Sequence, residues 1–150
     1  MKKLLFLLAV ITLAWQGTKA QDGAFEKTSK YNFQQTVETL KEEAVAAGWA
    51  IPAEHNMQAI LKKKNKEVLP ATILVLCNAN FAYELLKNDD TRKVQSMLPC
   101  RVAVYEKEDG KTYVAWSNYA KAGKEVTEEA IEVFTEIAEE IKEITTTVTD

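Results

Sequence analysis

Residues 71–77 (ATILVLC) and 98–106 (LPCRVAVYE) decide the fold, since each holds a run of apolar and β-branched residues that is typical of a strand. The first run is apolar throughout, which predicts a strand covered on both faces or nearly so. The second run alternates between two faces. Both cysteines of the chain lie in this stretch, Cys77 at the end of the first strand and Cys100 at the start of the next. We therefore treat the rest of the chain as a scaffold around these two strands.

Cys77 and Cys100 lie near each other if the two strands are antiparallel neighbours, because the end of one strand then meets the start of the other. Three interpretations stay open. In an oxidising compartment the pair forms a disulfide, which closes a loop of about two dozen residues and is worth roughly 3 kcal/mol by loop entropy. Alternatively, the pair is a redox-active or ligand-binding thiol site, or consists of two buried, inert thiols.

The residues beside the cysteines add to this candidate site. Asn78 can cap a following helix, and a helix N-terminus lowers a thiol pKa and suits anions. The wide spacing of the cysteines is not a Cys-x-x-Cys motif, so the redox signal is weak. We name Cys77, Asn78, Pro99 and Cys100 as the candidate ligand or redox site, and we predict no catalytic residue.

The first twenty residues are typical of a secretory signal peptide. A basic start at Lys2 and Lys3 precedes an apolar run over residues 4–15, and residues 18–20 (TKA) place small residues at the two positions that a signal peptidase recognises. The apolar run is shorter than the roughly 20 residues that a bilayer requires. We therefore expect cleavage before Gln21 and export to the periplasm or the extracellular space, with no membrane insertion afterwards.

The predicted mature chain, residues 21–150, is acidic. Loss of the lysines in the signal peptide changes the net charge from −3 to about −6. Such a domain is a poor candidate for nucleic acid, because affinity there comes largely from neutralised phosphates, and for anionic membrane surfaces. The length suits a single domain that needs neither a metal nor a disulfide merely to fold.

Cap residues and apolar spacing predict helices at residues 32–47, 56–64, 79–87 and 127–144, with a short helical segment at 91–97. In the second helix we expect Met57, Ile60 and Leu61 to face inward, and the lysines that follow to form a solvated turn. The glutamates on the outer face of the last helix are predicted to face solvent.

Three further strands are predicted. Residues 24–28 suit an edge strand, and residues 49–55 suit an edge or bulged strand because Pro52 cannot donate a ladder hydrogen bond. Asp109-Gly110 predicts a hairpin turn, which leads into a returning strand at residues 112–116.

Other candidate sites carry less weight. One histidine, His55, and two cysteines are too few for the usual zinc site, so we predict no metal and no cofactor. No Ser-His-Asp order, phosphate-binding glycine loop or paired-carboxylate motif stands out. The aromatic residues expected on strands (Trp49, Tyr105, Tyr113 and Trp116) are predicted to belong to the core or to a dimer interface rather than to a stacking platform.

The residues around the cysteines resemble the family catalogued as domain of unknown function 302. An apolar strand into Cys77-Asn78, a Leu-Pro-Cys sequence at residues 98–100 and a Val-x-Val-Tyr-Glu strand before an acidic hairpin carry the likeness, which covers about residues 26 to 120. Two positions depart from the family pattern: Ala79 stands where proline is frequent, and Asn56 where many members carry aspartate. The resemblance implies an α+β fold, in which an antiparallel sheet is backed by helices in a TATA-binding-protein-like arrangement. It also implies that some members form homodimers, and it implies no activity.

The leading hypothesis is an exported, non-catalytic domain that binds a small ligand or a partner near the Cys77/Cys100 end of the sheet. A thiol-dependent redox protein that uses the same pair is the competing hypothesis, and a structural or assembly module is the third. A homodimer is expected to form through a sheet edge or an aromatic face.

Overall fold

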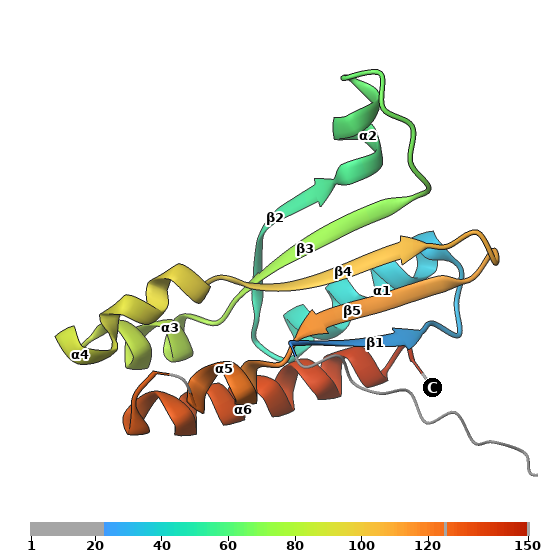
Figure 1. The fold of residues 1–150 in the computed structure, drawn as a ribbon. Helices are drawn as coiled ribbons and strands as arrows, with labels where there is room; N and C mark the ends of the chain where they lie inside the picture. The colour runs from blue at the N-terminus through green and yellow to red at the C-terminus, as the bar shows by residue number, and fades with distance from the viewer. Residues whose placement is uncertain (1–22, 125, 150) are drawn as a thin grey trace, which may run out of the picture.

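A five-stranded antiparallel sheet in the order β1-β5-β4-β3-β2 organises the chain in the computed structural model, which describes residues 23–124 and 126–149 (Figure 1). The strands are β1 (Ala24–Thr28), β2 (Ala50–Asn56), β3 (Ala71–Cys77), β4 (Cys100–Glu106) and β5 (Thr112–Ser117). The helices are α1 (Phe33–Ala46), α2 (Met57–Lys62), α3 (Ala79–Leu86), α4 (Asp89–Arg92), the 3-10 helix η1 (Lys93–Met97), α5 (Tyr119–Lys124) and α6 (Glu128–Thr146). The predicted α+β class, an antiparallel sheet backed by helices, is confirmed.

The caps predicted from the sequence form as expected. The Asn32 side chain accepts a hydrogen bond from the backbone N–H of Gln35 at the start of α1, and Asn56 and Thr127 cap α2 and α6 in the same way. Gly48, which follows α1, has a φ of 83°. A residue without a Cβ adopts this left-handed conformation at little cost, which is why the helix ends there.

The core lies between one face of the sheet and the helices α1 and α6. Leu74, Val102 and Val114 contribute to it from three neighbouring strands, and Leu40 and Phe134 contribute from the two helices. Each of these five side chains is at most 1% exposed. This packing fixes the positions of the strand ends that carry the cysteines.

The opposite face of the sheet is only partly covered. Ile73, Ala103, Tyr113 and Ala115 project there and are half-buried. The prediction that residues 71–77 are covered on both faces or nearly so therefore holds at Val75, which is 7% exposed, but not at Ile73, which is half-buried.

Helix α2 stands at the end of an arm that β2 and β3 form, away from the body of the molecule (Figure 1). It has no buried residue, and Ile60 is 44% exposed. The expectation that Met57, Ile60 and Leu61 face inward is therefore wrong for Ile60, while the other two side chains are half-buried. Helical spacing predicts which residues share a face, but it does not say whether another element lies against that face.

Helix α5 has no counterpart among the predicted elements, because its six residues carry no apolar stripe. It is held against α6 by a close approach at Gly123, where an added Cβ would lie 2.6 Å from the Cβ of Phe134. The position of α5 brings Tyr119, at its start, under the beginning of β4.

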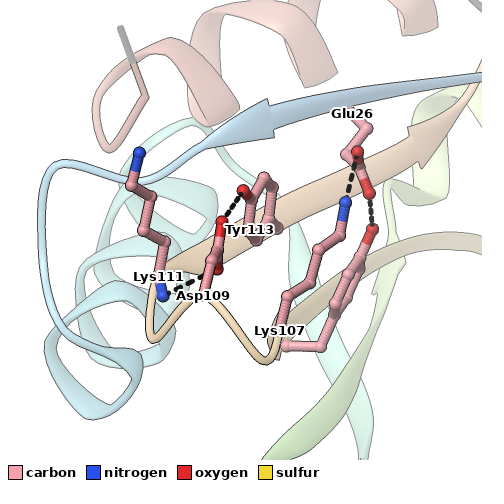
Figure 2. Close-up of polar contacts among 6 residues, drawn as sticks. Glu26, Lys107, Asp109, Lys111 and Tyr113 are labelled. Atoms are coloured by element: carbon pink, nitrogen blue, oxygen red, sulfur yellow. Dashed lines mark hydrogen bonds and ion pairs between the residues drawn. The ribbon is translucent and has the colours of Figure 1, made fainter.

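The hairpin between β4 and β5 is held by polar contacts on the open face (Figure 2). The Tyr105 hydroxyl and the Lys107 ammonium both donate to the carboxylate of Glu26 on β1, the latter at 2.8 Å. The Tyr113 hydroxyl donates to Asp109 at 2.6 Å. These contacts join β1, β4 and β5 at the end of the sheet opposite to the cysteines.

No helix among the described residues is long and apolar enough to cross a membrane. The predicted signal peptide and its cleavage position lie outside the described residues.

Candidate functional site

The candidate residues Cys77, Asn78, Pro99 and Cys100 all line one cavity, which has a volume of about 310 Å³. The cavity lies where β3 ends and β4 begins. Its size is near the lower end of the range for small-molecule sites. The sheet therefore brings two stretches, more than twenty residues apart in the sequence, to one concave surface.

Apolar side chains from several elements form most of the cavity wall. Leu76 and Cys100 contribute from the sheet, Phe81 from α3, Ile137 from α6, and Trp49 from the segment between α1 and β2. Trp49 is 3% exposed, and its ring lies 5.7 Å from that of Phe81 between centroids. Such a wall favours an apolar or aromatic ligand, because desolvation of these surfaces is the main favourable contribution that they can make.

Few polar groups lie beside the cavity, and two of them already have partners. The Trp49 indole Nε1–H donates to Glu140 Oε2 at 2.7 Å, so this glutamate of α6 holds the ring instead of only facing solvent. Asn78 Oδ1 accepts from the backbone N–H of Asn80 at 3.0 Å and so caps α3. Gln95 also lines the cavity. Only a few polar groups are therefore available to recognise the polar atoms of a ligand in this cavity.

The register of the sheet sets how the two cysteines face each other. Cys100 pairs with Leu76, and Cys77 is the next residue along β3. Successive side chains of a strand point to opposite faces of the sheet. The side chains of Cys77 and Cys100 therefore leave the backbone toward opposite faces. Both cysteines are free thiols in the structure, Cys100 buried and Cys77 half-buried. The register therefore favours the free-thiol interpretations, and the disulfide stays a prediction.

Cys100 is a poor nucleophile in this environment. Burial raises the pKa of its thiol to about 11, and the nearby Cys77 also raises it, against a smaller lowering by the Tyr119 hydroxyl. Cys100 is 2% exposed. A thiol that stays neutral and buried acts as a small apolar group, because the thiolate is the reactive form. Of the two cysteines, only Cys77 combines partial exposure with a position in the cavity wall.

Tyr119 is the residue of this region that sequence reasoning missed. Its hydroxyl accepts a hydrogen bond from the backbone N–H of Arg101 at 2.8 Å and lies against the Cys100 thiol. Burial raises the pKa of this hydroxyl. The sequence signal was slight, since a single tyrosine after a strand does not indicate a helix. Tyr119 fixes the start of β4, and therefore the position of Cys100.

The other candidates lie elsewhere. His55 is exposed on β2, away from the cavity lining, and the described residues contain no group of three or more His, Cys, Asp or Glu side chains that could hold a metal ion. Trp116 lies in the core, 5.6 Å from Phe25 between ring centroids. Tyr105 and Tyr113 stack on the open face with centroids 6.1 Å apart. Of the aromatic residues considered from the sequence, Trp49 alone lines the cavity.

Comparison with known proteins agrees with this fold. Residues 25–148 match the family model described as domain of unknown function DUF302. A crystal structure of an uncharacterized conserved protein DUF302 from Bacillus stearothermophilus is similar, with a TM-score of 0.76 and 20% sequence identity over 83% of this chain and 97% of that chain. At this identity the likeness shows the fold alone. A search of curated proteins finds no match.

Proposed function

This chain belongs to the family of domain of unknown function DUF302, and from that premise we propose that it is an exported, non-catalytic domain that binds a small, mainly apolar ligand. The proposed site is the cavity at the Cys77/Cys100 end of the sheet. The family carries no established activity, so the proposal depends on the residues of this chain.

One observation carries the proposal: a preformed cavity with an apolar wall lies at the residues that the sequence had already singled out. Trp49 and Phe81 line the cavity with their ring centroids 5.7 Å apart, and the hydrogen bond from Trp49 to Glu140 fixes one of these rings before binding. A wall that is already ordered costs little conformational entropy when a ligand binds. The small number of polar groups argues against a highly charged ligand.

Indole is a suitable probe, because it is apolar, planar and small. We expect titration with indole to shift the backbone amide NMR signals of Cys77, Phe81 and Leu98, with saturation. The variant Ala82→Leu, which adds side-chain volume at the cavity wall, should weaken binding about tenfold or more. Ala46→Leu is the matched control, since Ala46 is exposed on α1 and outside this cavity. Absence of saturable shifts, or equal binding by both variants, would contradict the proposal.

A thiol-dependent redox function is the second candidate, supported by the placement of both cysteines in one cavity wall. The burial of Cys100 and its pKa of about 11 weigh against it. We expect a thiol reagent to modify Cys77 in the folded protein and Cys100 only after unfolding, with the same thiol count with and without reductant. A count that rises only after reduction would instead show a disulfide, and measurement of its potential would separate a structural bond from a redox-active one.

A structural or assembly role is the third candidate. It predicts that Cys77→Ser lowers stability and cellular abundance together, with no separate loss of binding. If indole affinity falls while the stability of this variant is unchanged, a purely structural role is excluded.

A further inference from the structure

The Asn78 side chain in the cavity wall uses only one half of its amide. Its Oδ1 accepts a hydrogen bond from the backbone N–H of Asn80 at 3.0 Å and so caps α3. Its Nδ2 carries two N–H donors, and within residues 23–124 and 126–149 this atom has no hydrogen-bond partner. The side chain lines the cavity and is half-buried. The cap therefore leaves the donors of Asn78 without an acceptor.

The cap also decides which way the amide of Asn78 is turned. The backbone N–H of Asn80 needs an acceptor, and only the oxygen of the amide can accept, so the nitrogen is turned away from this N–H. The nitrogen is also accessible. No buried side-chain nitrogen or oxygen of the described residues lacks a hydrogen-bond partner, so an unpartnered Nδ2 must have accessible surface. The donors of Asn78 are therefore held in place before a ligand binds.

The other polar side chains of the wall offer less to a ligand. The Nε1–H of Trp49 already donates to Glu140 at 2.7 Å. Burial raises the pKa of the Cys100 thiol to about 11, so this group is neutral. Gln95 is exposed, so water reaches its amide. Among the described residues, no charged side chain lines the cavity.

This distribution of polar groups selects the chemistry of a ligand. An N–H that loses its water and gains no acceptor raises the free energy of the complex. A purely apolar ligand that covers Asn78 has this effect, whereas a ligand with an accepting oxygen avoids it. An ionised ligand loses its hydration and finds no opposite charge in the wall.

We infer that the ligand is a neutral carbonyl compound with an apolar ring, and that Asn78 determines this specificity. The inference rests on the proposed function of the cavity. The ring of the ligand lies in the part of the cavity that Trp49 and Phe81 line, and its carbonyl oxygen accepts from Nδ2 of Asn78. The apolar wall supplies most of the affinity, and the amide separates carbonyl compounds from hydrocarbons of the same shape.

Two probes of matched shape test the inference. Acetophenone and α-methylstyrene differ only in that the first has a C=O group where the second has C=CH₂. The hydrocarbon is the more hydrophobic, so a cavity without an available donor binds it more tightly. We expect titrations followed by the backbone amide NMR signals of Cys77 and Phe81 to show that the unmodified protein binds acetophenone at least as tightly as α-methylstyrene. Indole is titrated beside them.

Substitution of the amide should change this preference. Asn78→Asp keeps the cap, because aspartate caps a helix as well as asparagine does, but it removes the donors. The affinity for acetophenone relative to α-methylstyrene should fall about tenfold or more. Asn78→Ser also keeps a capping oxygen and adds no charge, and the preference should fall in the same direction. Asn32→Asp makes the matched change at the cap of α1, outside the cavity, and should leave the preference unchanged.

The outcomes separate this inference from the proposed function. Tighter binding of α-methylstyrene by the unmodified protein would overturn the inference alone, as would equal preferences in Asn78→Asp and Asn32→Asp. If neither probe nor indole binds, the proposed function fails and the inference fails with it. Ala82→Leu should weaken both probes alike, since it removes space and no donor. Circular dichroism should show that every variant is folded.

Discussion

At the scale of single residues, Cys100 shows how burial decides what a reactive group does. The same thiol at the surface would ionise near pH 8.5, whereas here burial raises its pKa to about 11. Tyr119 donates a hydrogen bond that offsets a part of this rise. The side chain that appears chemically active in the sequence is therefore a part of the core, and its neighbour Cys77 is the thiol that solvent reaches.

The raised pKa of Cys100 predicts a loss of stability in alkali. The folded protein holds the proton more tightly than the unfolded chain, so this stabilisation is complete below about pH 8.5 and is lost as the pH rises toward about 11. We expect the free energy of unfolding in urea to fall by about 2 kcal/mol over this interval, with a further contribution from the Tyr119 hydroxyl. Cys100→Ala should have a smaller slope with pH, and an unchanged slope would show that the thiol is not responsible.

At the scale of elements, the contact between α5 and α6 depends on one missing side chain. Gly123 lies where an added Cβ would come within 2.6 Å of the Cβ of Phe134, and Phe134 is a fully buried residue of α6. The close packing sets the position of α5, which in turn places Tyr119 beside Cys100.

Gly123→Ala should therefore destabilise the protein by about 1–3 kcal/mol, because the two helices must separate or Phe134 must shift within the core. Thermal unfolding followed by circular dichroism measures the effect. Gly23→Ala is the matched control, since a Cβ there has no atom within 4 Å, and its melting temperature should barely change. Equal melting temperatures for the two variants would mean that α5 is not packed as described.

At the scale of the whole molecule, the sheet separates two surfaces of different character. The Cys77/Cys100 end carries a small apolar cavity, and the opposite end carries the charged arm and an open groove that Val68, Leu69 and Tyr105 line. The proposed ligand site therefore shares no lining residue with the groove at the start of β3.

Export is a prediction about the whole chain. In cells of the source organism we expect the mature protein to begin at Gln21, because residues 18–20 place small residues at the cleavage positions. Intact-mass measurement of the purified mature protein checks this. Replacement of Ala20 by Lys should leave the signal attached, since the peptidase requires a small residue there. A mature protein that retains Lys2 and Lys3 would contradict the prediction.

The sequence by itself determined most of the elements. Cap residues located the starts of α1, α2, α3 and α6, and alternation together with the Asp109-Gly110 turn located β4 and β5. These features are local, because a cap or a turn acts within a few residues along the chain. The two cysteine-bearing strand ends could be placed near each other only by assuming that their strands are antiparallel neighbours, and the pairing of β3 with β4 confirms that assumption.

Only the tertiary structure decided which faces are covered and how the strand ends meet. It left Ile60 exposed on the arm, left one face of β3 half-covered and placed Cys100 opposite Leu76 rather than opposite Cys77. It also brought Trp49, Phe81 and Ile137 around the cysteines to form the cavity wall. Periodicity predicts the face of a helix or strand on which side chains lie. Whether another element covers that face, the register of the strands and the shape of the cavity arise from contacts between segments far apart in the sequence, which no local pattern encodes.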